Sequence, residues 1–396
     1  MNARTFPATA SPPSAPTGAT SRSPTCAVWL KSALRSGWLS RMPAGAVPPA
    51  ASPWTSTARP AAPVGRNCRS DNPWRTLTMD APLQISPLSE EVVPDWLALM
   101  NSGLQDCPGF EPLVDLDYQR MWGGDRARTG HSLAAERGRE LVGAVSLIFG
   151  RRRGRLRDLV VQPDARRCGT GTALIEAALD RFRERGLRLA EAQDWDAPSY
   201  RAFYAALGFR PVRRYLLLRW NLTAPLPALP LNHEVTVRPA TLTDLEEIAD
   251  LYARMYSPYW DWSREGTLEE VREEYRATFA RRFTEEESNR VYLVAVLEGR
   301  LVGGITARID EEYNQAKDVA LGSLNPGGVG VLPTYRRRGI GSRLLTEALA
   351  LLRECGMRQA AVWTFSYLES ETPAVVLYRQ SGATVARRSL GWEKPP

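Results

Sequence analysis

Apolar residues recur at helical spacing in two stretches of the chain that lie 170 positions apart. The first stripe consists of Leu174, Ile175, Ala178, Leu179 and Phe182. The second stripe consists of Leu344, Leu345, Ala348, Leu349 and Leu352. Each stripe predicts an amphipathic helix that packs its apolar face into a core, with Gly186 or Gly356 as a left-handed C-terminal cap.

The elements predicted around these helices follow the same order in both halves. Before the helix of the first half we expect a strand, a helix and three strands, at Leu83–Ser86, Val93–Met100, His131–Glu136, Glu140–Phe149 and Leu156–Val161. In the second half the same elements fall at Val235–Arg238, Asp244–Met255, Arg290–Leu297, Arg300–Ile309 and Gly328–Val331. After the helix come a strand (Leu187–Ala192 or Gln359–Thr364) and a helix that begins at Pro198 or Pro373.

Comparison of the chain with itself indicates a duplicated domain. Val161–Gly171 matches Val331–Gly341 at an offset of 170. Further on, Phe203-Tyr204 with Gly208 matches Leu377-Tyr378 with Gly382 at an offset of 174. The hairpin strands match at an offset of 160, so the second half carries small insertions, mainly around residues 311–328.

Three prolines alternate with other residues in Thr223–Asn232, which favours an extended, semi-rigid linker. The linker divides the body of the chain into domains at 79–222 and 233–396, as expected at roughly 150 residues per domain. Residues 1–78 hold 12 of the 30 prolines and no lasting apolar periodicity, so we expect a disordered tail rich in Pro, Ala, Ser and Arg. A misassigned translation start before Met79 and a transit segment are the alternatives for this tail.

The net charge of +7 is unevenly distributed. Residues 1–78 contain nine basic residues and one acidic residue, which leaves 42 basic and 43 acidic residues in the body. A nearly neutral body argues against a nucleic-acid partner. No run of apolar residues is long enough to predict a membrane span, so no membrane partner is expected.

Five cysteines without paired spacing and two histidines predict neither a disulfide framework nor a metal site. We therefore expect a reducing, cytoplasmic setting and no metal cofactor.

The sequence Arg-x-x-Gly-x-Gly stands between a strand and a helix in both halves. Glycines allow a tight turn and close approach of a ligand, and backbone N–H groups at a helix N-terminus favour an anion. The natural guest is a pyrophosphate. A plain tight turn is one alternative. A P-loop would need Gly-Lys-Ser/Thr, which neither copy has. A dinucleotide site would need a third glycine, which is absent, and an acidic residue further on. Glu191 takes that acidic position in the first half, but Ala361 takes it in the second.

Each half contains Val-x-Pro-x-x-Arg-x-x-Gly-x-Gly, followed by a helix, a strand and a second helix that carries a Tyr with a Gly four residues later. This pattern resembles the GNAT superfamily of acyl-CoA-dependent N-acyltransferases. The resemblance covers most of 79–222 and 233–396. It implies an α/β (α+β) fold with two tandem domains, each a mixed, splayed β-sheet flanked by helices, and acetyl-CoA as co-substrate.

The resemblance also implies which residues act. It assigns the general acid to Tyr204 and Tyr378. It assigns the acyl-CoA site to Leu159, Val161, Arg166, Arg167, Cys168, Gly169, Thr170, Gly171 and Thr172, and to Val329, Val331, Arg336, Arg337, Arg338, Gly339, Ile340, Gly341 and Ser342. Ala197 and Glu371 stand where family members often have Asn, which removes one expected side-chain contact.

Acyl transfer from a thioester to an amine needs an oxyanion donor, an acid for the thiolate and a route for the ammonium proton. Acids near strand ends are candidate bases, although each also fits a solvated loop charge: Asp158, Glu191, Glu311 and Glu312. Cys168 lies in the glycine loop, but Arg338 replaces it in the other copy, which argues against a nucleophile.

Two further patterns bear on the substrate. The acidic run 269–274 is preceded by four aromatic residues, Tyr256, Tyr259, Trp260 and Trp262. Aromatic rings and carboxylates together could surround a cationic amine. We favour the alternative, in which a helix has a solvent-exposed acidic face and the aromatic residues lie at the edge of the core. Arg151, Arg152, Arg153, Arg155 and Arg157 form a basic strand, for which phosphate steering, an acidic substrate and edge protection are all open.

These observations predict a tandem acetyltransferase that moves an acetyl group from acetyl-CoA to a primary amine of a small molecule or peptide. One catalytic half beside a degenerate half, and a non-catalytic acyl-CoA sensor, are the alternatives. The acceptor and the oligomeric state are left open, with a homodimer as one option.

Overall fold

The computed structural model describes residues 81–88, 93–114, 116–117, 131–256, 266–284, 289–325 and 327–396. The expected tail 1–78 and the residues Tyr259, Trp260 and Trp262 lie outside these ranges. Within the described ranges, no helix combines the length and apolarity needed to cross a bilayer.

The first half contains six strands and three α-helices among the described residues. They are β1 (Leu83–Pro87), α2 (Val93–Leu104), β2 (Ser132–Arg137), β3 (Glu140–Phe149), β4 (Arg153–Val161), α5 (Thr170–Glu184), β5 (Leu189–Trp195), α6 (Pro198–Ala206) and β6 (Arg210–Asn221). The predicted elements of this half are confirmed with ends shifted by a few residues, and β6 is an addition to them.

The second half repeats this order with two extra helices and a divided strand. Its elements are β7 (Thr236–Pro239), α7 (Leu245–Met255), α9 (Leu268–Thr284), β8 (Arg290–Leu297), β9 (Arg300–Ile309), α10 (Glu311–Lys317), β10 (Leu321–Ser323), β11 (Val329–Val331), α11 (Ile340–Glu354), β12 (Gln359–Tyr367), α12 (Pro373–Gln380) and β13 (Thr384–Lys394). The predicted insertion around residues 311–328 thus holds α10 and the break between β10 and β11.

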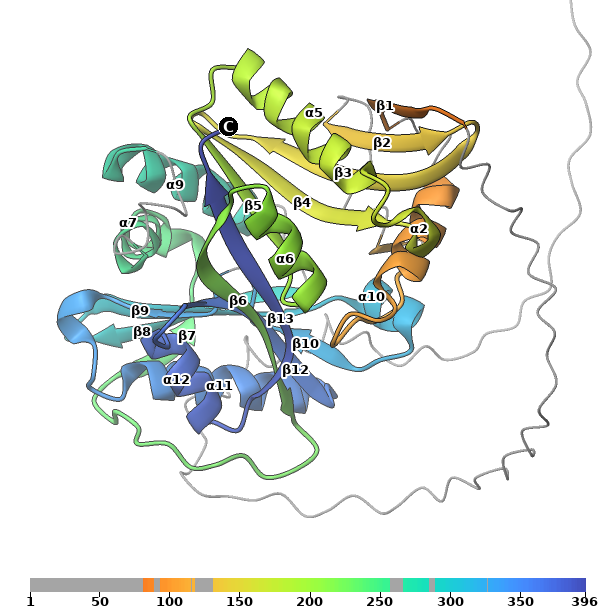
Figure 1. Ribbon diagram of the computed structural model, residues 1–396. Helices are drawn as coiled ribbons and strands as arrows, with labels where there is room; N and C mark the ends of the chain where they lie inside the picture. The colour runs from red at the N-terminus through yellow and green to blue at the C-terminus, as the bar shows by residue number, and fades with distance from the viewer. Residues whose placement is uncertain are drawn as a thin grey trace, which may run out of the picture.

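The described strands form one mixed sheet in the order β1-β2-β3-β4-β5-β13-β6-β12-β10-β9-β8-β7, with β11 paired to β9. The last strand of each half crosses to the other half. Strand β13 pairs with β5 and with β6, and β6 pairs with β12, all antiparallel. Figure 1 shows β6 and β13 running side by side, with α5 and α6 of the first half on one side and α11 and α12 of the second half on the other.

The exchanged strands complete the hydrophobic core of the opposite half. Leu216, Leu218 and Trp220 of β6 belong to the core around α11, whereas Leu390 and Trp392 of β13 belong to the core around α5. All five side chains are buried. Removing either Trp would cost on the order of 3–5 kcal/mol, so each half depends on the other for its stability.

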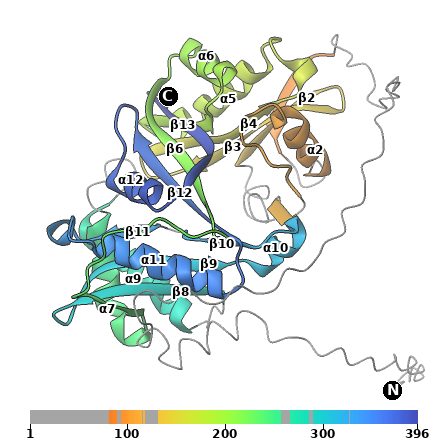
Figure 2. The same cartoon turned by 90° about the horizontal axis from the view of Figure 1, so that it is seen from below.

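The parallel strand pairs open at their C-terminal ends. Strand β4 pairs with β5 only over Arg153–Arg157, and β10 pairs with β12 only over Leu321–Ser323. Beyond these points β4 and β11 continue along β3 and β9 alone. The expected splay is therefore present in both halves, and we call each opening a wedge. Figure 2 shows α11 lying on the sheet beside β11.

Candidate active site

Both Arg-Gly loops adopt a backbone geometry that exposes N–H groups. Arg167 and Gly169 have φ of 62° and 82°, and Arg337 and Gly339 have φ of 64° and 73°. A left-handed conformation at a non-glycine residue is uncommon and costs free energy, so its repetition in both loops indicates a constrained loop. The geometry suits an anion-binding concavity at the start of a helix.

The helices that follow the loops leave their first N–H groups without an acceptor in the helix. The first bond of α5 runs from the N–H of Ala173 to the carbonyl of Gly169, at 2.9 Å. The first bond of α11 runs from Arg343 to Gly339, at 3.0 Å. The N–H groups of residues 170–172 and 340–342 are thus available to a pyrophosphate, which fits the residues assigned by resemblance.

The first arginine of each loop has a scaffolding role. The guanidinium of Arg166 donates to the carbonyls of Val161, at 3.1 Å, and Gly103, at 2.6 Å. Arg336 donates to the carbonyls of Val331 and Met255, both at 3.0 Å. These bonds tie loop, strand end and helix end together, which leaves the exposed side chains of the neighbouring arginines for an anion.

The linker between the halves contacts the second loop. Asn232 donates its side-chain amide to the carbonyl of Arg338, at 2.9 Å, and its backbone N–H to the carbonyl of Gly339, at 3.3 Å. Because the linker binds carbonyl groups, the N–H groups of this loop are not used by it. A Cβ on Gly169 of the first loop would meet nothing within 4 Å, so no described segment covers that loop in the same way.

The wedge of the first half is bridged by its own side chains. Asp194, on β5, accepts the backbone N–H of Leu159 at 3.2 Å and also accepts the hydroxyl of Tyr204. The hydroxyl of Tyr200 donates to the carbonyl of Leu159, at 2.8 Å. Both backbone groups of Leu159 that the resemblance assigns to acyl-CoA are therefore engaged within the protein.

The wedge of the second half has a different arrangement. The backbone N–H of Val329, which corresponds to Leu159, donates to the hydroxyl of Tyr378 at 2.8 Å. The position of Asp194 on β5 is taken on β12 by Thr364, and Ala374 stands four residues before Tyr378, as Tyr200 stands before Tyr204. The second half thus lacks both side chains that bridge the first wedge.

Burial affects the ionisation of both tyrosines. Tyr204 and Tyr378 are buried, and burial raises the pKa of both hydroxyls, with the carboxyl of Asp194 raising the pKa of Tyr204 further. Burial also raises the pKa of Asp194 well above its ordinary value. Tyr378 therefore stays protonated at neutral pH, as a general acid must, whereas the hydroxyl of Tyr204 is bonded to Asp194.

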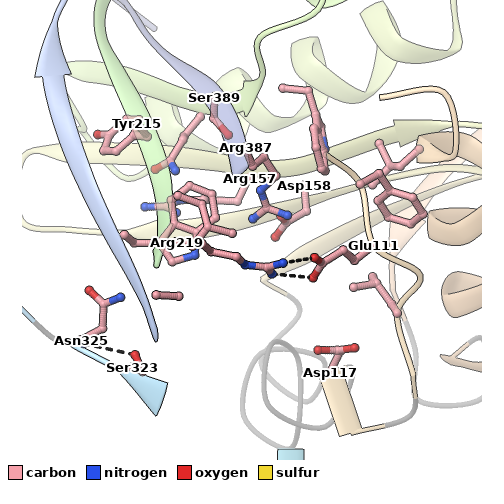
Figure 3. Close-up of a pocket in the computed structure, with 18 of the residues that line it drawn as sticks. Glu111, Asp117, Arg157, Asp158, Tyr215, Arg219, Ser323, Asn325, Arg387 and Ser389 are labelled. Carbon is pink, nitrogen blue, oxygen red and sulfur yellow. Dashed lines mark hydrogen bonds and ion pairs between the residues drawn. The ribbon is translucent and has the colours of Figure 1, made fainter. Parts of the chain in front are cut away.

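A cavity of about 910 Å³ lies between the halves and borders both wedges. Its wall includes Asp194 from the first wedge and Ser323, Asn325 and Thr364 from the second. Figure 3 shows residues from both halves facing one another across it, with Arg219 of β6 bonded to Glu111 at 2.5 and 2.8 Å. Across the same gap, Lys317 of α10 pairs with Asp117 at 2.7 Å.

The candidate bases lie in different environments. Glu191 is paired with Arg153 at 2.7 Å and with Arg155 at 2.8 Å, so two residues of the predicted basic strand share one carboxylate. Asp158 lines the cavity and has a positive φ of 55°. Glu311 and Glu312 lie in the first turn of α10 and do not line the cavity.

The acidic run of the second half forms the outer face of α9. Glu269 and Glu273 pair with Arg272 and Arg276 on the same helix, at 3.2 and 2.7 Å. Val271 and Phe279 are buried on its inner face. This arrangement supports the acidic helix face over the amine box.

Several site residues carry no motif in the sequence. In the sequence, nothing distinguishes Asp194 and Thr364 from other strand residues, and Asn232 belongs to the predicted linker. The only signal is the repeat itself, because aligning the halves pairs Asp194 with Thr364 and Tyr200 with Ala374.

Residues 96–209 and 245–383 match the Acetyltransferase (GNAT) family. A mycothiol acetyltransferase from Thermobifida fusca is 29% identical over 324 residues, which cover 76% of this chain and 94% of that protein. Another mycothiol acetyltransferase, from Thermobispora bispora, is 31% identical over 233 residues, which cover 57% of this chain and 72% of that protein.

Solved structures share the fold. A GCN5-related N-acetyltransferase from Sphaerobacter thermophilus superposes with a TM-score of 0.65 at 19% identity, over 79% of this chain and 95% of that one. A tandem GNAT protein from the clavulanic acid biosynthesis pathway superposes with a TM-score of 0.56 at 19% identity, over 79% of this chain and 98% of that one. With a family match in each half and two wedges on one sheet, this chain belongs to the acetyltransferase (GNAT) family and is a tandem member of it.

Proposed function

We propose that the chain is an N-acetyltransferase that transfers the acetyl group of acetyl-CoA to an amine of a small molecule, and that its second half is the catalytic half. The observation that carries the proposal is the hydrogen bond between the Tyr378 hydroxyl and the backbone N–H of Val329, at 2.8 Å, in a wedge without the carboxyl found in the first half.

Each group in the second wedge has a role in this chemistry. Acetyl-CoA supplies the activated acetyl thioester. The loop before α11 holds phosphate through its N–H groups, and the N–H of Val329 donates to the Tyr378 hydroxyl oxygen, which orients that hydroxyl in the wedge. Tyr378 keeps its proton at neutral pH and gives it to a departing thiolate. The ammonium loses a proton to water in the cavity, the amine nitrogen bonds to the acetyl carbon as the carbon–sulfur bond breaks, and the proton released from nitrogen returns Tyr378 to its protonated state through the same water.

In the first half, the loop keeps its N–H geometry, but Asp194, Tyr200 and Tyr204 bridge the wedge. This supports a half that serves the fold and at most binds an anion. A small-molecule acceptor agrees with the names of the relatives, which are mycothiol acetyltransferases, and with a cavity of about 910 Å³ beside the catalytic wedge.

A matched pair of variants tests the assignment. A Cβ at Gly171 would lie 3.3 Å from Phe203, and a Cβ at Gly341 would lie 3.3 Å from Leu377. The variants Gly171→Asp and Gly341→Asp therefore introduce side chains at equally close contact with their neighbours. Each carboxylate would oppose a bound pyrophosphate, at a cost of several kcal/mol. We expect Gly341→Asp to lower kcat/KM for CoA release on an amine panel by on the order of 100-fold or more, and Gly171→Asp to change it only a few-fold.

The other outcomes identify the alternatives. Loss of activity in Gly171→Asp alone would place catalysis in the first half. Unchanged acetyl-CoA binding in both variants would refute the loop assignment. Tight acetyl-CoA binding by the unaltered chain without CoA release on any amine would favour a sensor, and binding of NAD in place of acetyl-CoA would favour a dinucleotide enzyme.

A further inference from the structure

Two arginines hold corresponding positions on the exchanged strands. Arg213 of β6 and Arg387 of β13 each lie nine residues after the tyrosine of their own half. In the pairing of the two strands, Arg213 stands opposite Gly391 and Arg387 stands opposite Leu217, on either side of the pair Tyr215 and Ser389. The two arginines are therefore related by the internal repeat, and their surroundings can be compared directly.

Arg213 is neutralised by carboxylates. It pairs with Glu393 at 2.5 Å and lies 4.0 Å from Glu191, and its side chain is only 8% exposed. This is the usual condition of a buried guanidinium, since an unpaired buried charge is costly.

Arg387 has no such partner. The position that corresponds to Glu393 is Arg219, and the position that corresponds to Glu191 is Ala361. Among the described residues no ion pair joins Arg387 to a carboxylate, and its Nε is buried without a hydrogen-bond acceptor. Burial lowers the pKa of this guanidinium, although the nearby carboxylates of Asp158 and Glu111 act to raise it.

Two indoles hold Arg387 in place. Its guanidinium carbon lies 4.7 Å from the ring centre of Trp195, on β5, and 4.4 Å from that of Trp363, on β12. Stacking on aromatic faces orients a guanidinium and leaves its N–H groups free at the edge. Arg387 lines the cavity between the halves, near Arg157 and Asp158 (Figure 3).

The remaining charges of the cavity are mostly paired. Glu111 bonds Arg219, Asp117 bonds Lys317, and Asp310 bonds Arg308 at 2.8 Å. Asp194 is bonded to Tyr204 and to the backbone of Leu159. Two arginines on the wall, Arg157 and Arg387, form no ion pair with a described carboxylate.

We propose that Arg387 binds an anionic group, a carboxylate or a phosphate, of the acceptor that enters the cavity between the halves. The proposal rests on the proposed acetyltransferase function, because it assigns the anion to the amine substrate. The aromatic clamp holds the guanidinium as a planar fork whose N–H groups can donate to two oxygens at once. Arg387 is then a specificity-determining residue, and the acceptor is an amino acid, an amino-acid-like acid or an aminoalkyl phosphate.

Matched acceptors test the proposal. CoA release is measured with amino acids and dipeptides against their C-terminal amides, and with aminoethyl phosphate against ethanolamine, which separates the two anions. Hydrogen bonds to a charged group are worth on the order of 10- to 100-fold in affinity. We expect the unaltered chain to prefer the acid of one of these pairs by that factor in kcat/KM, and Arg387→Gln to reduce the ratio to about one. Arg387→Lys, which keeps the charge but not the planar fork, should keep part of the preference.

Arg219→Gln is the control, because Arg219 lines the same cavity but is already paired with Glu111. It should keep the preference for the acid. Circular dichroism and acetyl-CoA titration establish that each variant is folded and binds the co-substrate. An unaltered chain that treats acids and amides alike, or a preference that survives in Arg387→Gln, would overturn the proposal.

Binding without turnover separates this proposal from the proposed function. The same acids and amides are titrated calorimetrically into the chain saturated with CoA. If no amine releases CoA but acids bind at least 10-fold more tightly than amides, and only when Arg387 is present, the anion site stands and the acetyltransferase proposal fails. If amines are acetylated without any preference for acids, the reverse holds. If no acid binds and no acid is acetylated, the anion site is refuted.

Discussion

The tyrosines at equivalent positions in the two wedges have opposite hydrogen-bonding roles. In the first half the hydroxyl of Tyr204 donates to a buried carboxyl, and in the second half the hydroxyl of Tyr378 accepts a backbone N–H. The strand, loop and helix around them are equivalent. The carboxyl that accepts the proton of Tyr204 belongs to Asp194 on the neighbouring strand, and Thr364 takes this position in the second half.

The comparison extends to the charges on the exchanged strands. Arg213 is neutralised by Glu393, whereas Arg387 faces the cavity between two indoles. In both comparisons a carboxylate partner is present on the first side, Asp194 for Tyr204 and Glu393 for Arg213, and is absent on the second. Under the proposed assignment, the first half is a rigid partner of one catalytic half, and the crossed strands β6 and β13 join the two.

The largest expected effect comes from removing the two hydroxyls separately. We expect Tyr378→Phe to lower kcat for CoA release by on the order of 100-fold or more, because a general acid contributes about 10²–10⁴. Acetyl-CoA affinity should stay within a few-fold, as measured by calorimetry. Tyr204→Phe is the matched control and should leave kcat nearly unchanged, while it lowers the free energy of unfolding by about 1–3 kcal/mol by removing a donor to buried Asp194. Equal loss of kcat in both variants would contradict the division of roles.

A smaller effect concerns the pH dependence of stability. Because burial raises the pKa of Asp194 in the folded chain, the folded state binds more protons than the unfolded state above the ordinary Asp pKa of about 4. The contribution of Asp194 to the free energy of unfolding therefore falls as pH rises from about 4 towards the folded-state pKa. Asp194→Asn cannot titrate, so its stability relative to the unaltered chain should increase over that range. Urea unfolding of both proteins at several pH values measures the difference, and parallel pH profiles would show that this carboxyl has an ordinary pKa.

Sequence patterns predicted the repeated units because apolar periodicity and the glycine loops are local signals. The crossing of β6 and β13 is not local. Both strands carry Arg-Arg-x-Leu, at Arg213–Leu216 and Arg387–Leu390, so either could complete either sheet, and only the packed cores decide. Asp194 and the Trp195–Arg387–Trp363 stack were missed for the same reason, since their partners lie on strands distant in sequence. The scaffolding bonds of Arg166 and Arg336 were missed because a loop arginine before two glycines is equally suited to phosphate.

The smallest expected effect tests the contact that only the second loop has. Asn232 holds the carbonyls of Arg338 and Gly339, and we propose that this keeps the loop's N–H groups oriented for phosphate. Asn232→Ala removes the side-chain bond to Arg338, a loss of about 0.5–1.5 kcal/mol, together with the bonds that its side-chain oxygen accepts from the N–H groups of Glu234 and Val235. If that free energy serves to orient the loop, acetyl-CoA should bind the second half roughly 2- to 10-fold more weakly, with kcat at saturation unchanged. Thr223→Ala, at the other end of the linker, is the control, because the side-chain bond of Thr223 runs to Asn221 and touches neither loop. Equal affinities for Asn232→Ala and Thr223→Ala would mean that the linker covers the loop without ordering it.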